Sequence, residues 1–186
     1  MSKTDSPNKA KRVRIFDAEM MRRALRRIAH EVIERNEKLG ALILAGIPNR
    51  GIELSQRIAA EIEAVAQVRI ATGVIDVSMH RDDVGRRASL PVVRASKLPL
   101  PLEGKTIVIV DDVLFTGRTC RAALDAIRSF GRPAVIQLAV LIDRGHRELP
   151  VKADFVGKNV PTAQSESVHV RLTEMGGADE VVVEKK

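Results

Sequence analysis

Short apolar runs alternate with amphipathic stretches along this chain of 186 residues, and this alternation constrains its fold more than any other feature. The runs are of strand length and read ALILAGI (41–47), KTIVIV (105–110) and AVIQLAVLI (134–142). Residues 51–65 and 118–131 have apolar positions at helical spacing. Strands that are apolar on both faces and alternate with helices are typical of a parallel sheet covered on both sides. We therefore predict the α/β class, with a parallel twisted sheet flanked by helices.

The remaining segments are less regular. A helix is predicted from an N-cap at Asp17 to Gly40, and residues 68–80 favour extended structure. Residues 81–104 mix charges, glycine and prolines without a period, which indicates a long mobile loop. The C-terminal third breaks the alternation, so extra strands and loops are expected there, appended to the sheet as a small cap. We expect a disordered basic tail over residues 1–12 and a single domain over residues 13–186.

The composition limits the class of protein. A formal net charge of +7 suits a polyanionic partner such as RNA or a phosphorylated substrate, and it equally suits solubility alone. With 4 Phe and no Trp or Tyr, single-strand binding by stacking on several aromatic rings is disfavoured. Cys120 is the single cysteine, which excludes an intrachain disulfide and a cysteine-built metal cage. No apolar run approaches the roughly 20 residues of a membrane span, and no signal peptide is recognisable. A cytoplasmic location without a membrane partner is expected.

Two adjacent carboxylates follow the apolar run at 105–110. In open parallel sheets, ligands bind at the carboxyl ends of the strands, and Asp111 and Asp112 occupy that place. Because carboxylates repel a bare phosphate, their role is to accept hydrogen bonds from hydroxyls or to hold a hydrated Mg²⁺ that bridges to phosphate. A ribose phosphate meets both requirements.

The loop after the aspartates, LFTGRT (114–119), leads into a predicted helix. Backbone N–H groups at a helix start have no intrahelical partner and attract anions. Thr116 and Thr119 add hydroxyl donors, and Gly117 allows a close approach of the backbone. The chain has neither the G-x-x-x-x-G-K-[ST] nor the G-x-G-x-x-G phosphate motif. A second strand-end loop, PNRG (48–51), carries a cation and suits a second anionic group.

Residues 107–119 resemble the phosphoribosyl pyrophosphate signature of type I phosphoribosyltransferases: an apolar strand, an acidic pair, a T-G loop and then R-T. Other stretches resemble one bacterial family, the pyrimidine operon attenuation regulators that are also uracil phosphoribosyltransferases. These stretches are MRRALRRIAHEVIERN, ILAGIPNRGIEL, HRDDVGRR and IQLAVLIDRGHRELPVKADFVGKNVPT. The resemblance covers nearly all of residues 15–172.

The resemblance implies roles for individual residues. Asp111, Asp112 and Arg81 would be catalytic, and the two aspartates would hold Mg²⁺ through water. Arg144 and the backbone near Val160 would hold the base. The pyrophosphate would be bound by Asn49, Arg50, Gly51 and Arg81. The ribose phosphate would be bound by Asp111, Asp112, Val113, Leu114, Phe115, Thr116, Gly117, Arg118 and Thr119.

A basic face on the first predicted helix raises a second hypothesis, which concerns RNA binding. Arg23, Arg27 and His30 share one face of the first predicted helix. By themselves they indicate a solvated face on which Arg27 pairs with Glu31. The resemblance instead implies a surface that grips an RNA stem-loop, made of Arg23, Arg27, His30, Arg35, Arg147, Lys152 and Lys158.

The predicted function therefore has two parts. The chain is expected to convert uracil and phosphoribosyl pyrophosphate, with Mg²⁺, to UMP and pyrophosphate. It is also expected to bind the leader RNA of pyrimidine genes in a UMP-dependent way, as a homo-oligomer. A purine or orotate phosphoribosyltransferase without RNA binding, and a UMP-sensing regulator with little catalytic activity, remain as alternatives, because the motif at 107–119 reads the sugar phosphate and not the base.

Overall fold

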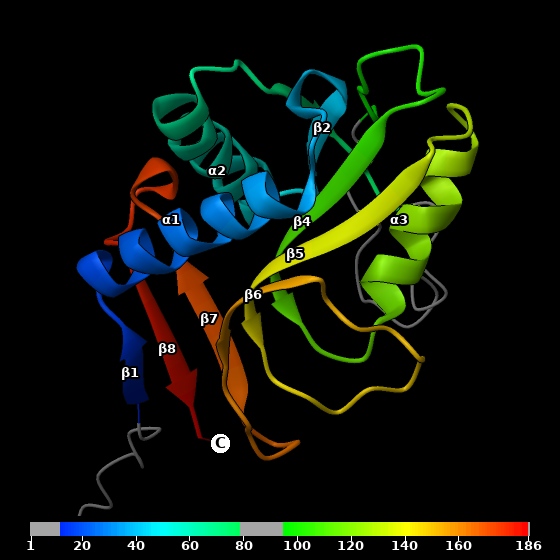
Figure 1. The fold of residues 1–186 in the computed structure, drawn as a ribbon. Helices are drawn as coiled ribbons and strands as arrows, with labels where there is room; N and C mark the ends of the chain where they lie inside the picture. Colours follow the sequence, from blue (N-terminus) through cyan, green and yellow to red (C-terminus); the bar gives the residue numbers. More distant parts are fainter. Residues whose placement is uncertain (1–11, 79–94, 186) are drawn as a thin grey trace, which may run out of the picture.

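The computed structural model describes residues 12–78 and 95–185 of the chain. Its centre is a parallel sheet of five strands in the order β3-β2-β4-β5-β6 (Figure 1). The prediction of a parallel α/β sheet is confirmed. The strands are β2 (Leu42–Gly46), β3 (Ala71–Val74), β4 (Thr106–Leu114), β5 (Val135–Asp143) and β6 (Phe155–Asn159).

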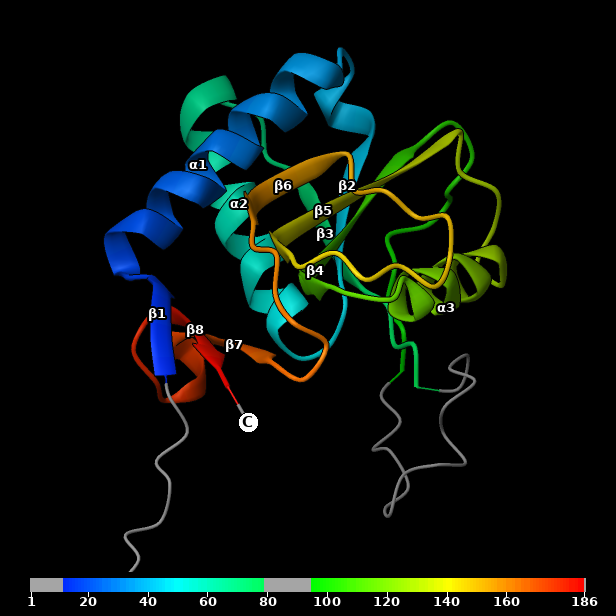
Figure 2. The same ribbon diagram turned by 90° about the horizontal axis from the view of Figure 1, so that it is seen from below.

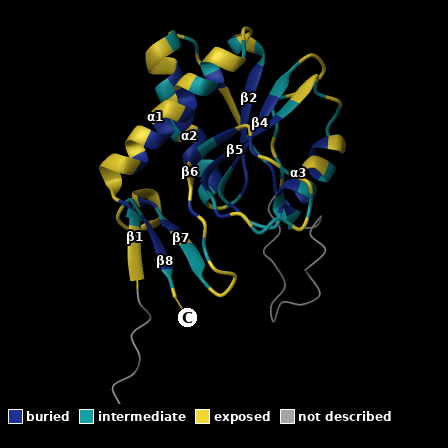
Figure 3. Ribbon diagram, turned by 60° about the horizontal axis from the view of Figure 1, so that its bottom comes forward, coloured by how far each residue is buried: buried dark blue, intermediate teal, exposed yellow. Residues whose placement is uncertain are grey.

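Helices cover both faces of this sheet. Helices α1 (Ala18–Arg35) and α2 (Arg50–Ala66) lie on one face, and α3 (Arg118–Arg128) lies on the other (Figures 1 and 2). Alternate residues of β4 enter two different cores: Val108 and Val110 pack with α1 and α2, whereas Ile107 and Ile109 pack with α3. The central strands are buried on both sides while the helices keep an exposed outer face (Figure 3). The apolar runs in the sequence reflect this two-sided burial.

A second, antiparallel sheet has the order β1-β8-β7, and we call it the cap sheet. Its strands are β1 (Arg12–Phe16), β7 (Ser167–Arg171) and β8 (Glu180–Glu184). Of the extra C-terminal strands predicted to be appended to the sheet as a small cap, β6 joins the main sheet, whereas β7 and β8 belong to the cap sheet. Strand β1 was not predicted, since its pairing depends on a segment at the other end of the chain. Val170, Val181 and Val183 pack into the same core as α1 and α2.

Two predicted element ends are also corrected. Helix α1 ends at Arg35 and not at Gly40, because the Nδ2 of Asn36 donates to Val32 O (2.9 Å) and to Gln137 Oε1 of β5 (3.0 Å). Strand β4 does not end at the aspartates but pairs with β5 as far as Leu114. Contacts between distant segments, of Asn36 with Gln137 and of β4 with β5, contribute to both ends, and the local sequence pattern does not report such contacts.

The predicted mobile loop is only partly described. Arg81 lies outside the described residues, as does the rest of 79–94. Within 95–104, Lys97 forms an isolated bridge with Val74, and Glu103 forms one with Pro133.

A 3-10 helix, η1 (Leu39–Ala41), precedes β2, and another, η3 (Thr173–Met175), follows β7. None of the described helices is long and apolar enough to span a membrane.

The strand order creates one crevice at the carboxyl edge of the sheet. The chain leaves β2 through α2 towards β3, and it leaves β4 through α3 towards β5, on the opposite side. Neighbouring strands whose connections depart in opposite directions leave a ligand-binding crevice between their carboxyl ends. Here that crevice lies between the ends of β2 and β4.

Candidate active site

The acidic pair lies at the crevice, within the last residues of β4. Successive residues of a strand point to opposite faces of a sheet. The carboxylate of Asp112 lies on the α2 side, where Oδ2 is 3.6 Å from Nη1 of Arg50. Asp111 Oδ1 accepts a hydrogen bond from the backbone N–H of Asp112 (2.9 Å). The two carboxylates therefore reach different sides of the crevice, and Asp112 pairs with the cation that follows β2.

The loop that follows β2 is fixed by close backbone packing. A Cβ placed on Gly51 would lie 2.3 Å from the carbonyl oxygen of Val110, immediately before the acidic pair. Only a residue without a side chain allows this approach. Asn49 is the N-cap of α2 and Arg50 is its first residue. Of the four residues predicted to bind pyrophosphate, Asn49, Arg50 and Gly51 thus lie in the loop beside the end of β4, and Arg81 lies outside the described residues.

Arg50 also faces a small cavity. The cavity measures about 250 Å³ and is lined by Arg50 and by residues 170–172 and 175–177 of the cap. The Nε of Arg50 is buried and has no hydrogen-bond partner among the described residues. A buried unsatisfied donor is costly, and an anionic oxygen would satisfy it.

The predicted phosphate loop, residues 114–119, leads into α3. Gly117 is the N-cap of α3 at φ 91°, in the left-handed region, and as a glycine it offers no side-chain acceptor to the helix start. The backbone N–H of Arg118 donates weakly to Thr116 Oγ1 (3.4 Å), and its guanidinium pairs with Glu148 (2.7 Å). The carbonyl of Thr116 accepts from the N–H groups of Glu148 (3.0 Å) and Leu149 (3.1 Å), which ties the loop to residues 144–151. A helix start that follows a glycine N-cap is a suitable anion site.

Arg144, predicted to bind the base, is buried and hydrogen-bonded to the segment after β6. Its guanidinium donates to Thr162 Oγ1 (3.0 Å) and to the carbonyls of Ala163 (3.2 Å) and Glu166 (2.7 Å). It also lies 4.1 Å over the ring of Phe115. Burial lowers the pKa of Arg144 from its ordinary value. Arg144 therefore fixes the segment after β6 to the phosphate loop.

Asp143, at the end of β5, was missed by the sequence analysis. Its carbonyl accepts the N–H of Val160 (2.8 Å), and its carboxylate accepts from Gly145 N (3.0 Å) and from the guanidinium of Arg147. His146 was also given no role, yet its Nε2 lies 2.5 Å from the carbonyl of Thr162. A positive φ of 58° at His146 marks this tight turn, which no local sequence signal predicts.

Cys120, in the first turn of α3, is a buried free cysteine. Burial, assisted by the charge of Asp111, raises the pKa of Cys120 to about 11. Among the described residues, no group of three or more His, Cys, Asp or Glu side chains gathers as a metal cage. Any Mg²⁺ at the acidic pair would need further ligands from substrate and water.

Comparisons with known proteins agree with this geometry. The model of the phosphoribosyl transferase domain family matches residues 13–174. The chain is 60% identical over 169 residues to the bifunctional protein PyrR of Chloroflexus aurantiacus, covering 91% of this chain and 93% of that protein. It is 56% identical over 170 residues to the bifunctional protein PyrR of Roseiflexus sp., with the same coverage of 91% and 93%. The chain belongs to the PyrR family of phosphoribosyl transferase domain proteins. The resemblance predicted from the sequence is confirmed.

Solved structures support the fold at low sequence identity. A Trypanosoma cruzi hypoxanthine phosphoribosyltransferase superposes with a TM-score of 0.73 at 20% identity, covering 98% of this chain and 95% of that one. A hypoxanthine-guanine phosphoribosyltransferase from Bacillus anthracis has a TM-score of 0.71 at 14% identity, with coverage of 95% and 99%. At these identities the likeness concerns the fold alone.

The residues predicted to bind RNA gather mainly where α1 packs beside the edge strand β6. Arg27 pairs with Glu31 (2.7 Å), as the solvated-face interpretation predicts, and it also donates to the carbonyl of Gly157 (2.6 Å). Arg35 is 3.5 Å from Asp154, just before β6. Arg23 and His30 on α1 and Lys152 and Lys158 near β6 are exposed.

Arg147 is placed differently. Its guanidinium donates to the carbonyls of Val151 (2.9 Å), Phe115 (2.8 Å) and Gly145 (3.1 Å) and pairs with Asp143. These bonds hold the turn after β5 together, and an RNA contact of Arg147 stays a prediction.

Proposed function

We propose that the chain transfers a phosphoribosyl group from phosphoribosyl pyrophosphate to uracil, and that the same nucleotide site controls binding of leader RNA. One observation supports the transferase most directly. The Arg50 loop after β2 meets Asp112 of β4 at the crevice, and the predicted phosphate loop continues from β4 to the glycine N-cap of α3. A cation, two carboxylates and a helix N-terminus in one crevice suit the pyrophosphate, the ribose hydroxyls and the 5′-phosphate of one donor molecule.

In the proposed reaction, a uracil nitrogen displaces pyrophosphate from C1 of the ribose. The bond between C1 and the pyrophosphate oxygen breaks as the bond to the nitrogen forms, and positive charge develops on the sugar. Asp111 and Asp112 orient the ribose hydroxyls and lie near this charge, while Arg50 receives the departing anion. Arg81, which lies outside the described residues, is proposed to close over the pyrophosphate.

Mg²⁺ fits the acidic pair as an ion that arrives with the donor. Mg²⁺ in proteins keeps several waters and binds through one or two carboxylates plus substrate phosphates. Asp111 and Asp112 would hold it through water, and the ion would neutralise charge on the leaving pyrophosphate. Two carboxylates from the protein suit this kind of magnesium binding, because water and substrate phosphates supply the remaining ligands.

The base is proposed to lie between Phe115 and the segment after β6. The N–H of Val160 already donates to Asp143, so recognition of uracil there would use other backbone groups of that segment. Arg144 would act through its bonds to Thr162 and Glu166, which fix the position of the segment.

The enzyme hypothesis is tested by pyrophosphate release from phosphoribosyl pyrophosphate and Mg²⁺, with uracil compared against hypoxanthine, adenine and orotate. Turnover is expected with uracil only. Turnover with another base would favour the purine or orotate alternative. If no base is turned over but UMP binds, the regulator with little activity is the better interpretation.

For RNA, we propose that the surface formed by α1 and β6 contacts the phosphate backbone. The ion pairs of Arg27 and Arg35 are exposed, and such pairs contribute only about 0–1 kcal/mol. They can therefore exchange for RNA phosphates at little cost. Affinity for a pyrimidine leader RNA should rise with UMP and fall with salt. An affinity that does not respond to UMP would refute the sensing role. Arg128→Ala, on α3 at the opposite face of the sheet, is a control that should bind RNA normally.

A further inference from the structure

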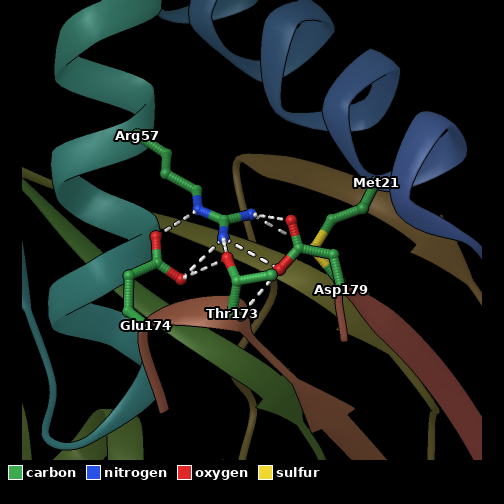
Figure 4. Close-up of polar contacts among 5 residues, drawn as sticks. All are labelled: Met21, Arg57, Thr173, Glu174 and Asp179. Atoms are coloured by element: carbon green, nitrogen blue, oxygen red, sulfur yellow. Dashed lines mark hydrogen bonds and ion pairs between the residues drawn. The ribbon is translucent and has the colours of Figure 1, made fainter. Parts of the chain in front are cut away.

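Arg57, in the middle of α2, is the centre of a dense polar cluster that no predicted role explains (Figure 4). Its side chain is only 22% exposed. The guanidinium donates to both carboxylate oxygens of Asp179 (2.8 and 2.9 Å) and to both of Glu174 (2.8 and 2.6 Å). It also donates to the hydroxyl of Thr173 (3.1 Å) and lies 3.7 Å from the sulfur of Met21 on α1. Two bidentate carboxylate pairs on one arginine make a geometrically specific contact.

The carboxylates belong to one turn of the cap, residues 172–179, which we call the cap turn. It runs from the end of β7 through η3 to the start of β8. Asp179 also accepts the backbone N–H of Thr173 (2.9 Å), so the turn is closed on itself. Arg57 thus joins the cap turn to α2 through bonds that span more than 110 residues of sequence.

The same helix and the same turn enclose the cavity beside Arg50. Arg50 precedes Arg57 by seven residues, nearly two turns of helix, so the two side chains leave α2 on almost the same face. The cavity of about 250 Å³ is lined by Arg50 and Arg171 and by residues 175–177 of the cap turn, and none of the described residues that line it carries a carboxylate. Its shape therefore depends on where the cap turn sits relative to α2.

We propose that Arg57 is a positioning residue for the pyrophosphate end of the donor. By fixing the cap turn against α2, it shapes the cavity in which Arg50 meets the anion. The inference rests on the proposed transferase function and deepens it. Arg57 does not touch the donor, and its effect passes through the cap turn.

A positioning role of Arg57 predicts an effect on the pyrophosphate end of the site and not on the base end. The segment proposed to hold the base is fixed by Arg144 and Asp143, with which Arg57 makes no contact. Disturbing Arg57 should therefore weaken the pyrophosphate end of the site and spare the base end. A general loss of structure would weaken both.

The experiment uses the full chain and inorganic pyrophosphate with Mg²⁺ as the probe. Affinity is measured by calorimetry, and KM is measured for phosphoribosyl pyrophosphate and for uracil. Arg57→Lys keeps the charge but cannot form two bidentate pairs. It should weaken pyrophosphate binding and raise KM for the donor by roughly ten- to a hundredfold, as expected for a misplaced anion site. KM for uracil should stay within about twofold of the wild type.

Arg26→Lys is the matched control, because Arg26 also pairs across helices, with Glu61 of α2 (3.1 Å), but is exposed. It should change no parameter by more than about twofold. If Arg57→Lys does not fold, Glu174→Gln is used in its place, because it weakens the pairing of Arg57 with the cap turn by changing the acceptor. Unchanged pyrophosphate affinity in a folded variant overturns the proposal, and so does an equal loss for uracil. A wild-type protein that binds no pyrophosphate refutes the proposed transferase function itself, before any variant is compared.

Discussion

Replacing Gly51 with alanine should damage both the stability and the donor site. The new Cβ would lie 2.3 Å from the carbonyl oxygen of Val110, whereas ordinary contact begins near 3.4 Å. Because the nearest atom belongs to the backbone of β4, no side chain can rotate away, and the start of α2 must move by about 1 Å relative to the strand. Overpacking of this kind costs about 1–3 kcal/mol, and the better helix propensity of alanine offsets at most about 1 kcal/mol of it.

The movement also carries Arg50 away from Asp112, and a misplacement of about 1 Å can cost up to 10²-fold in rate. Thermal unfolding should show a lower Tm, and pyrophosphate release should show a lower kcat/KM for the donor. Gly40→Ala is the matched control, since nothing lies within 4 Å of a Cβ at that position. If Gly51→Ala matched Gly40→Ala in both measurements, the close approach of α2 to β4 would not matter and the reasoning would be refuted.

Other predictions address separate parts of the molecule. Asp112→Asn should lower kcat/KM for pyrophosphate release by about 10- to 100-fold, the worth of a hydrogen bond to a charged group, with Tm nearly unchanged; wild-type activity would contradict a ribose-binding role. Hydrogen bonds from Arg57 lower the pKa of both Asp179 and Glu174 in the folded chain. The ion pairs of Arg57 with these two carboxylates therefore stabilise the fold fully at a pH above the ordinary pKa values of Asp and Glu. This stabilisation is lost as the pH falls through the lower pKa values of the folded chain. Acid denaturation between about pH 5 and pH 2 should therefore be less steep in Arg57→Met than in the wild type, and parallel curves would argue against the coupling. Lys158→Ala should reduce the slope of log affinity for RNA against log salt by about 1, whereas an unchanged slope would place Lys158 outside the RNA interface.

The predicted phosphate loop shows which structural features can be predicted from the local sequence pattern and which cannot. The order of apolar strand, acidic pair, Thr-Gly turn and helix was readable in the sequence, because strand burial and turn chemistry depend on neighbouring residues. The structure places Gly117 in the left-handed region at the start of α3, where such a loop needs it. The length of β4 was not readable, since the pairing of its last residues with β5 is a contact between distant segments.

The arginines show that composition and spacing alone do not assign a role to a charged side chain. Arg144 and Arg147 were both assigned ligand roles, yet both bond chiefly to backbone carbonyls of the turns around the site. Arg57 received no role, although it makes two bidentate pairs. A sequence states that a charge is present but not which way a long flexible side chain turns.

The sequence by itself determined the alternation of strands and helices, the parallel sheet and the ribose phosphate motif, because each follows from periodicity or from residues adjacent in the chain. Only the tertiary structure decided that β1 pairs with β8, that Arg50 meets Asp112, and that Arg57 meets Asp179 across 122 residues of sequence. Those contacts form when the whole core packs, and the energy that selects one partner among many belongs to that packing and not to any local segment.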